Sequence, residues 1–160
     1  MLKQQLEFNE NGYLKNDFYE IDLLTFEDYF VKAFPFSTTR QHLFENYLAY
    51  IEDFKRDVFP YFEQWIDGSF ITQKENPKDI DIVTFLDYKV YELRGEPFMD
   101  RFWSFSLEKQ GIDAYIFKTY PTSHKLFPSF LEIERYYQNL FSSDRIDRTK
   151  GIIKLKFEKS

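Results

Sequence analysis

Residues 65–83 read WIDGSFITQKENPKDIDIV, and this stretch decides the fold. An apolar segment at residues 61–66 leads into Gly68 and Ser69, and a second apolar run, DIDIVTF, occupies residues 79–85. Short apolar runs rich in β-branched residues favour buried strands. The glycine and serine indicate a tight turn, followed here by at most two helical turns. The stretch therefore predicts two strands that flank a turn with unpaired backbone N–H groups.

Two carboxylates open the second of these strands. Asp79 and Asp81 are two residues apart, so in a strand both side chains project to the same face. Carboxylates placed in this way can share two divalent ions about 4 Å apart. A third acid on a neighbouring strand would complete the site, and Asp113 in the strand-like run IDAYIF is the best candidate. Asp87 and Asp100 are weaker candidates for the same role.

Phosphate-binding residues are expected beside these acids. A glycine at position 68 lets a phosphate approach the backbone closely, and the hydroxyl of Ser69 can donate a further hydrogen bond. Lys74 lies between the turn and the acids, where it can reach a phosphate as a flexible point charge. The turn and the acids together predict a site that binds both phosphate and metal.

Helices and one further strand are predicted around this core. Thr25 is a good N-cap for a helix that ends near Pro35, and apolar residues recur at helical spacing over residues 37–58, with Arg40 among the residues on the other faces. A helix with a broad apolar face is expected at residues 124–141, and residues 89–108 allow no clear assignment. The expected single domain comprises an N-terminal arm at 1–22, a helical region at 23–58, a catalytic core at 61–118 and, at 124–160, a helix and the alternating edge strand GIIKLKFEK.

Composition limits the chemistry that this chain can perform. A chain of 160 residues can bury a sizeable core. The absence of cysteine excludes thiolate ligands and disulfides, and only two histidines are present, so zinc is poorly supplied. The 27 acidic residues instead suit a hard cation such as magnesium. No apolar run is long enough for a signal peptide or a membrane span, so a cytoplasmic protein without a membrane partner is expected.

The aromatic fraction of 21% is high and has two interpretations. The rings can stack nucleic-acid bases, or they can fill a core that has few smaller apolar residues. Their helical spacing favours core filling, and Trp65 and Trp103 are interpreted as core residues. His124 is interpreted as a helix-capping residue.

The charge balance points the same way. The net charge of −6 leaves nucleic acid only a local basic patch to bind. The best patch consists of the C-terminal residues Arg145, Arg148, Lys150, Lys154, Lys156 and Lys159, whose ordinary interpretation is a solvated edge strand.

The order of these parts resembles a known family. An apolar strand, Gly-Ser, about ten residues and then Asp-x-Asp in an apolar run is similar to the signature of DNA-polymerase-beta-like nucleotidyltransferases. The resemblance covers residues 61–118, and the wording DGSF…K…P.DID is similar to a small bacterial and phage branch of that superfamily. It implies an α+β nucleotidyltransferase fold with a small mixed sheet packed against helices. Minimal members that act as antitoxins carry an arginine shortly after Gly-Ser, whereas this chain has Phe70, Ile71 and Thr72.

The resemblance also implies a reaction. Gly68, Ser69 and Lys74 would bind a nucleoside triphosphate, and Asp79, Asp81 and Asp113 would be the catalytic acids and the ligands of Mg²⁺ or Mn²⁺. The implied enzyme moves a nucleoside monophosphate to a hydroxyl of a protein or an RNA and releases pyrophosphate. The alternative is a catalytically idle domain of the same fold that acts as an interaction or nucleotide-sensing module in a toxin–antitoxin or phage-defence system. The nucleotide, the acceptor and the oligomeric state are left open.

Overall fold

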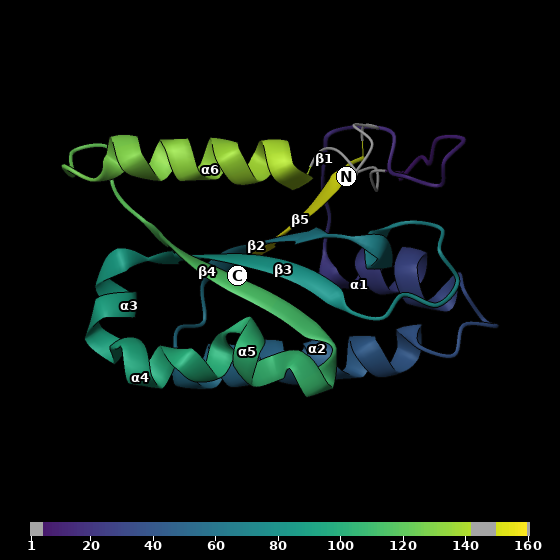
Figure 1. Ribbon diagram of the computed structural model, residues 1–160, viewed down its shortest axis with the longest axis horizontal. Helices are drawn as coiled ribbons and strands as arrows, with labels where there is room; N and C mark the ends of the chain where they lie inside the picture. Colours follow the sequence, from purple (N-terminus) through teal and green to yellow (C-terminus); the bar gives the residue numbers. More distant parts are fainter. Residues whose placement is uncertain (1–4, 142–149, 160) are drawn as a thin grey trace.

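One open mixed sheet lies at the centre of the molecule (Figure 1). The computed structural model describes residues 5–141 and 150–159, and within these ranges the sheet has five strands in the order β1-β5-β2-β3-β4. β1 with β5 and β3 with β4 are parallel pairs, whereas β2 is antiparallel to both of its neighbours. The strands are β1 (Phe18–Glu20), β2 (Phe62–Asp67), β3 (Ile80–Asp87), β4 (Ile112–Thr119) and β5 (Ile152–Phe157).

Helices cover the two faces of the sheet unequally. Among the described residues, the long helix α2 and the short helices α3 to α5 lie on one face, and α6 lies on the other (Figure 1). The helical elements are α1 (Leu23–Glu27), the π-helical η1 (Asp28–Lys32), α2 (Arg40–Asp57), the 3₁₀ turn η2 (Ser69–Ile71), α3 (Tyr88–Arg94), α4 (Glu96–Met99), η3 (Asp100–Phe102), α5 (Ser104–Leu107), η4 (Glu108–Gln110) and α6 (Phe127–Phe141). Residues 89–108, which the sequence left unassigned, thus form a chain of short helices.

Alternation along β3 divides its side chains between the two faces. Ile80 and Ile82 are buried in the larger core cluster with residues of α2. Val83 and Phe85 belong to a smaller cluster that includes Trp65 and packs against Phe130 of α6. Because side chains alternate along a strand, Asp81 lies on the α6 face of the sheet.

Arg40 connects α2 to the loop that follows the Gly-Ser turn. Its side chain is fully buried, and its guanidinium donates to the carbonyl oxygens of Phe30 (2.7 Å), Phe70 (2.6 Å), Thr72 (2.8 Å) and Lys74 (2.6 Å). The interpretation of Arg40 as one of the residues on the outer faces of its helix is therefore wrong. One arginine therefore satisfies three carbonyl groups of the segment that follows Gly68, and a fourth in η1.

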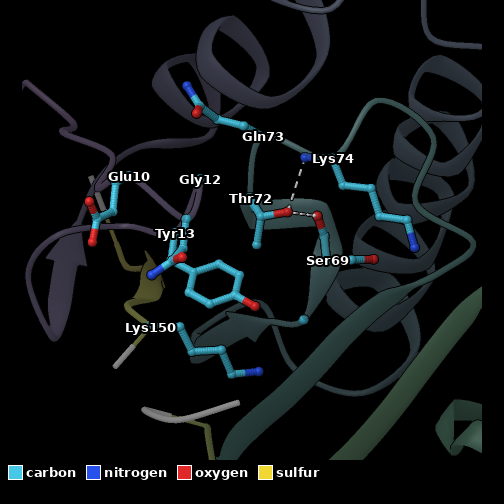
Figure 2. A pocket seen from close by; sticks show the side chains of 10 residues that line it. Glu10, Gly12, Tyr13, Ser69, Thr72, Gln73, Lys74 and Lys150 are labelled. Atoms are coloured by element: carbon cyan, nitrogen blue, oxygen red, sulfur yellow. Dashed lines mark hydrogen bonds between the residues drawn. The ribbon is translucent and has the colours of Figure 1, made fainter. Parts of the chain in front are cut away.

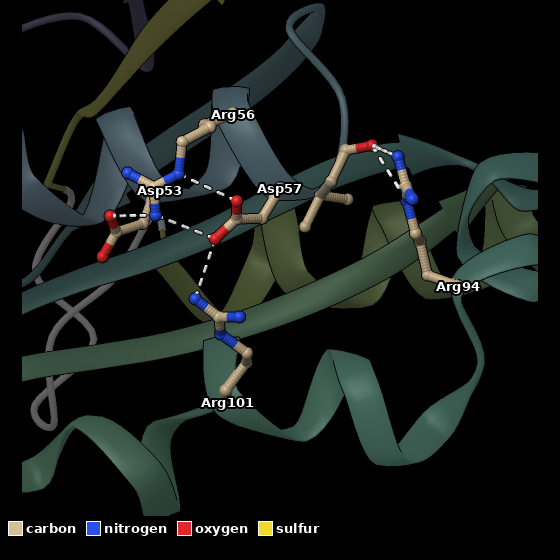
Figure 3. Close-up of polar contacts among 6 residues, drawn as sticks. Asp53, Arg56, Asp57, Arg94 and Arg101 are labelled. Carbon is tan, nitrogen blue, oxygen red and sulfur yellow. Dashed lines mark hydrogen bonds and ion pairs between the residues drawn. The ribbon is translucent and has the colours of Figure 1, made fainter.

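The end of α2 is tied to the short helices by polar contacts (Figure 3). Arg101 donates to Asp57 Oδ2 at 2.9 Å, and Arg56 donates to Asp57 Oδ1 at 2.9 Å. Arg94 donates through Nε and Nη2 to the carbonyl oxygen of Val58, at 3.3 and 3.1 Å. These contacts fix α3 and η3 beside the edge strand β4.

Three features differ from the sequence-based expectations. β5 is not an edge strand, because β1 from the N-terminal arm pairs with it on the side opposite β2. The first helix begins earlier than expected, since Asp22 is its N-cap and accepts a hydrogen bond from the backbone N–H of Thr25 at 2.7 Å. Trp103 is partly exposed rather than in the core, whereas Trp65 is buried.

None of the helices within residues 5–141 and 150–159 combines the length and the apolar character that crossing a membrane requires.

Candidate functional site

Three aspartates lie side by side on adjacent strands. Asp67 of β2 is the register partner of Asp81 of β3, and Asp81 is the register partner of Asp113 of β4. Neighbouring strands are about 4.8 Å apart, so the three carboxylates form a row on the α6 face. Asp79 lies directly before β3 and joins this row. We call Asp67, Asp79, Asp81 and Asp113 the acid row.

The negative charges of the acid row repel one another. Burial raises the pKa of Asp81 to about 8. The negative charge of Asp79 raises this pKa further, and so do a hydrogen bond with Asp113 and the charges of Asp113 and Asp67. The pKa of Asp79 is also raised, first by burial and then by Asp113. Closely spaced carboxylates without a counterion are expected to behave in this way. A cation close to the row would relieve this repulsion.

Asp67, the last residue of β2, is a further member of the row that was not predicted from the sequence. It is 5% exposed, and its Oδ2 accepts from Lys150 Nζ at 3.3 Å. Its Oδ1 is buried and has no hydrogen-bond partner among the described residues. Burial raises the pKa of Asp67 to about 6, although Lys150 opposes the shift. The signal in the sequence was an acid at the last position of a strand, two residues before Ser69.

Gly68 packs directly against Asp81. Its φ angle is +78°, a conformation that glycine adopts readily, and a Cβ at this position would overlap Asp81 Oδ2. The turn then continues into η2, which begins at Ser69. The close approach requires glycine at position 68 for two independent reasons, backbone conformation and space.

A large cavity opens beside the Gly-Ser turn (Figure 2). Its volume is about 650 Å³, and Gly68, Ser69, Lys74 and Lys150 line it. The N-terminal arm provides the opposite wall through Glu10, Asn11, Gly12 and Tyr13. The cavity thus has two lysines and a serine on the side that faces the acid row.

The N-terminal arm is held in place as a hairpin. Phe8 and Leu14 form a bridge, and the backbone N–H of Asn9 donates to the carbonyl oxygen of Tyr13 at 2.8 Å. The carbonyl oxygen of Gly12 accepts from the backbone N–H of Gln73 at 2.9 Å. The N-terminal arm therefore contacts the loop that follows Ser69, a contact that local sequence patterns do not reveal.

The acids border a second, smaller cavity. It measures about 250 Å³ and is lined by Asp79, Asp113 and Ser104 among others. Ser104 Oγ donates to Asp113 Oδ1 at 2.6 Å and orients that carboxylate. The site residues therefore line two cavities, where one shared cleft was expected. Asp81 lies between them, against Gly68 on one side and beside Asp113 on the other.

The other residues considered in the sequence lie away from the acid row. Asp87 caps α3 at the opposite end of β3 by accepting from the backbone N–H of Lys89 at 2.8 Å, and Asp100 begins η3. His124 accepts from the backbone N–H of Leu126 at 3.0 Å, in agreement with a capping role. These residues take part in local structure.

The C-terminal basic residues that the structure describes are mostly paired. Lys150 pairs with Asp67, Lys154 with Glu63 and Lys156 with Glu20. Arg145 and Arg148 lie outside the described residues. Among the described residues, the cations of this segment thus stabilise acidic side chains of neighbouring strands.

The donor set of the acid row fits a hard divalent cation. All of its ligands would be carboxylate oxygens, which Mg²⁺ and Mn²⁺ prefer, and Asp67 Oδ1 is buried without a partner. In the part of the chain that the structure describes, no three His, Asp or Glu side chains surround one point closely enough to form a finished metal cage. Binding would require the carboxylates to lose their shared proton and turn toward the ion.

The fold and the site define a protein with a mixed five-stranded sheet in its described part and a row of acids beside a Gly-Ser turn. A model of a family of unknown function, DUF6932, matches residues 6–156, and the chain belongs to this family. No curated protein and no solved structure matches the chain.

Proposed function

We propose that this protein is a magnesium-dependent nucleotidyltransferase with the nucleotidyltransferase fold, which moves a nucleoside monophosphate from a nucleoside triphosphate to a hydroxyl of a protein or an RNA. The carrying observation is the register of Asp67, Asp81 and Asp113 on adjacent strands, directly beside Gly68 and Ser69. This arrangement supports the proposal because it combines a phosphate-binding turn with carboxylates that gain stability from a cation.

The residues of the site have separate tasks in such a reaction. Ser69 and the backbone N–H groups of the turn would hold the triphosphate, and Lys74 and Lys150 would neutralise its outer oxygens. Mg²⁺ or Mn²⁺ held by the acid row would supply charge neutralisation at the phosphate under attack. Ser104 fixes the direction of Asp113 and so positions one of the ligands.

The reaction exchanges a phosphoanhydride bond of the triphosphate for a phosphodiester bond to the acceptor. The acceptor oxygen forms a bond to the α-phosphorus, and the bond from that phosphorus to the bridging oxygen of pyrophosphate breaks. The electron pair of the broken bond leaves with pyrophosphate. The acceptor proton passes to a carboxylate of the acid row and then to solvent. Lys74 and Lys150 remain with the leaving pyrophosphate, where charge increases during the reaction.

A second candidate function is a catalytically idle interaction or nucleotide-sensing module, in a toxin–antitoxin or phage-defence setting. One observation favours it: Ile133 and Leu140 of α6, and Leu126 directly before it, are spaced seven residues apart and are 43%, 51% and 40% exposed. Residues with this spacing lie on one side of a helix, as in a helix-pairing seam. An apolar seam on α6 suits a protein partner.

Incorporation of labelled nucleotide distinguishes the two functions. Wild-type protein and Asp81→Asn are incubated with cell extract, each of the four labelled triphosphates, and Mg²⁺ or Mn²⁺. The enzyme predicts labelling by the wild type and its collapse in Asp81→Asn, because the substitution keeps the shape and removes a charge that binds the cation. Asp53→Asn, the same change at an exposed acid of α2, is the matched control and should label normally.

The opposite results contradict the enzyme. Equal labelling by the wild type and Asp81→Asn would assign the signal to something else in the extract. No labelling with any of the four triphosphates would favour the interaction module. In that case, polar substitutions at Ile133 and Leu140 should abolish capture of the partner, and Asp81→Asn should not.

A further inference from the structure

A second large cavity lies beside β4, the edge strand of the sheet. Its volume is about 430 Å³, within the range of about 300 to 1,000 Å³ that small-molecule sites occupy. Residues 116–118 of β4 form one wall, and Ser129 and Phe130 of α6 form another. Trp103, which follows η3, closes the cavity on the side of the short helices. None of its lining residues has a task in the proposed phosphate site.

Flat rings dominate the walls of this cavity. Five aromatic side chains line it: Tyr91, Trp103, Phe117, Tyr120 and Phe130. Rings from a sheet, a loop and two helices offer both faces and edges to an occupant. Aromatic surfaces of this kind stack on flat ring systems such as nucleobases, at about 1–3 kcal/mol per base. The cavity therefore fits a planar ring better than an aliphatic chain.

Polar groups lie at the rim of the rings. The hydroxyl of Tyr91 donates to Glu96 Oε2 at 2.9 Å, and Lys118 Nζ lies 4.7 Å from the centre of the Tyr91 ring. Glu96, Lys118 and Ser129 all line the cavity. In addition, half of the backbone N–H and C=O groups of an edge strand point away from the sheet. Donors and acceptors around flat faces match the edge of a nucleobase.

The cavity is connected to the acid row through two neighbouring side chains. Trp103 precedes Ser104, whose hydroxyl donates to Asp113. The ring of Trp103 lies edge-on to Tyr115, with centroids 6.2 Å apart. Phe117 in the cavity is four residues from Asp113 along β4, about 13 Å in an extended strand. A ring in the cavity thus lies within one or two nucleotides of the proposed reaction centre.

These observations identify the acceptor side of the site. Resting on the proposed nucleotidyl transfer, we propose that the cavity beside β4 binds a nucleobase of the acceptor, and that the acceptor is the end of an RNA. The lysines at the other cavity hold the triphosphate, on the opposite side of Asp81. The two substrates then approach the acid row from opposite sides, which an in-line displacement requires.

Binding of nucleoside monophosphates without added metal tests the cavity. Trp103 is the only tryptophan left in a Trp65→Phe protein, so its fluorescence reports the cavity. AMP, GMP, CMP and UMP are titrated against this protein, and calorimetry on the wild type gives the same constants without the Trp65 substitution. At least one nucleotide should quench Trp103, because its base stacks on the indole ring. N-acetyl-tyrosinamide, the probe for a protein acceptor, should not.

Two substitutions by phenylalanine separate the cavity from the rest of the surface. Ser129→Phe fills the cavity from α6 and should weaken the binding at least tenfold. Ser123→Phe, the same change at an exposed serine that does not line the cavity, should leave it unchanged. Asp53→Asn, at an exposed acid of α2 that does not line the cavity, should also leave it unchanged. Circular dichroism checks that each variant is folded.

Each of the other outcomes overturns the inference. No quenching by any nucleotide, equal binding by Ser129→Phe, or tighter binding of N-acetyl-tyrosinamide than of all nucleotides excludes a base-binding cavity. The proposed function is tested separately, since labelling that depends on Asp81 can persist when the cavity binds no base. Conversely, nucleotide binding that Ser129→Phe removes would stand even if no transfer activity were found.

Discussion

The Asp81 carboxyl is enclosed by a close backbone contact and by three other acids. Gly68 packs against it on one side, Asp113 shares a hydrogen bond with it on the other, and Asp67 and Asp79 add negative charge. Each of these neighbours disfavours its ionised form in the absence of a cation. The protonation state of Asp81 would therefore link the stability of the sheet to the binding of a cation at the acid row.

Asp81 predicts a pH dependence of stability in the metal-free protein. Its pKa is about 8 in the folded state and about 3.8 as the reference value for the unfolded chain. Between these values the folded state binds more protons, so the free energy of unfolding falls as the pH rises from about 4 to 8. Asp81→Asn does not titrate and should be more stable than the wild type at pH 9, by about 2 kcal/mol.

Urea denaturation in EDTA at pH 5 and pH 9 measures this difference. The gain of the variant over the wild type should be large at pH 9 and small or reversed at pH 5. Asp53→Asn, at an exposed acid, should show the same difference at both values. A variant that is less stable than the wild type at pH 9 would show that Asp81 is not repelled by its neighbours.

At the scale of elements, Arg40 holds the loop between Ser69 and Asp79, beside the proposed phosphate-binding turn. Arg40 reaches from the first turn of α2 to carbonyl groups of Phe70, Thr72 and Lys74, and its guanidinium lies 3.8 Å from the centre of the Phe34 ring. Burial lowers the pKa of Arg40 to about 10, so it remains charged at neutral pH. The loop between Ser69 and Asp79 is thus held by a charge that serves as a hydrogen-bond donor.

Arg40→Met should destabilise the protein by about 3 kcal/mol or more, because three buried carbonyl groups and one partly buried carbonyl group lose their donor. Arg56→Met is the matched control, since its side chain is 64% exposed and its ion pairs lie at the surface, where a pair contributes less than about 1 kcal/mol. Urea denaturation of both variants gives the comparison. Equal losses would mean that the carbonyl groups find other donors in the absence of Arg40.

The same elements show what local patterns predict and what they omit. The two strands around Gly-Ser and the strand with Asp113 were predicted because their apolar runs and flanking turns are encoded nearby. The position of β5 inside the sheet was not predicted, because one of its two neighbours is β1, which lies more than 130 residues earlier in the chain. The burial of Arg40 and Asp67 was not predicted for a related reason. Arg40 donates hydrogen bonds to carbonyl groups distant in sequence, and Asp67 pairs with the distant Lys150.

For the molecule as a whole, the arrangement around the acid row separates two kinds of substrate. The cavity with Lys74 and Lys150 lies on the β2 side, and the aromatic cavity lies on the β4 side. Residues of the N-terminal hairpin line the first cavity, and residues of α3, α4 and α6 line the second. One sheet can therefore hold a phosphate ligand and a planar ligand on opposite sides of the same carboxylates.

Magnesium should stabilise the whole molecule if the acid row binds it. A ligand that binds only the folded state adds RT ln(1 + [L]/Kd), about 1.4 kcal/mol at a concentration ten times Kd, or roughly 3–5 °C in a protein of this size. The shift should be larger at pH 8.5 than at pH 6, because Asp81 must lose its proton before the row can bind the ion.

Thermal unfolding in 10 mM MgCl₂, compared with NaCl of equal ionic strength, measures this shift. The salt control is needed because screening alone relieves part of the repulsion between acids. Asp113→Asn removes one ligand at the β4 side and should lose most of the magnesium-specific shift, whereas Asp53→Asn should keep it. Equal shifts in MgCl₂ and NaCl, or an unchanged shift in Asp113→Asn, would contradict a metal site in the acid row. The enzyme proposal would then lose its cation, although the aromatic cavity could still bind its ligand.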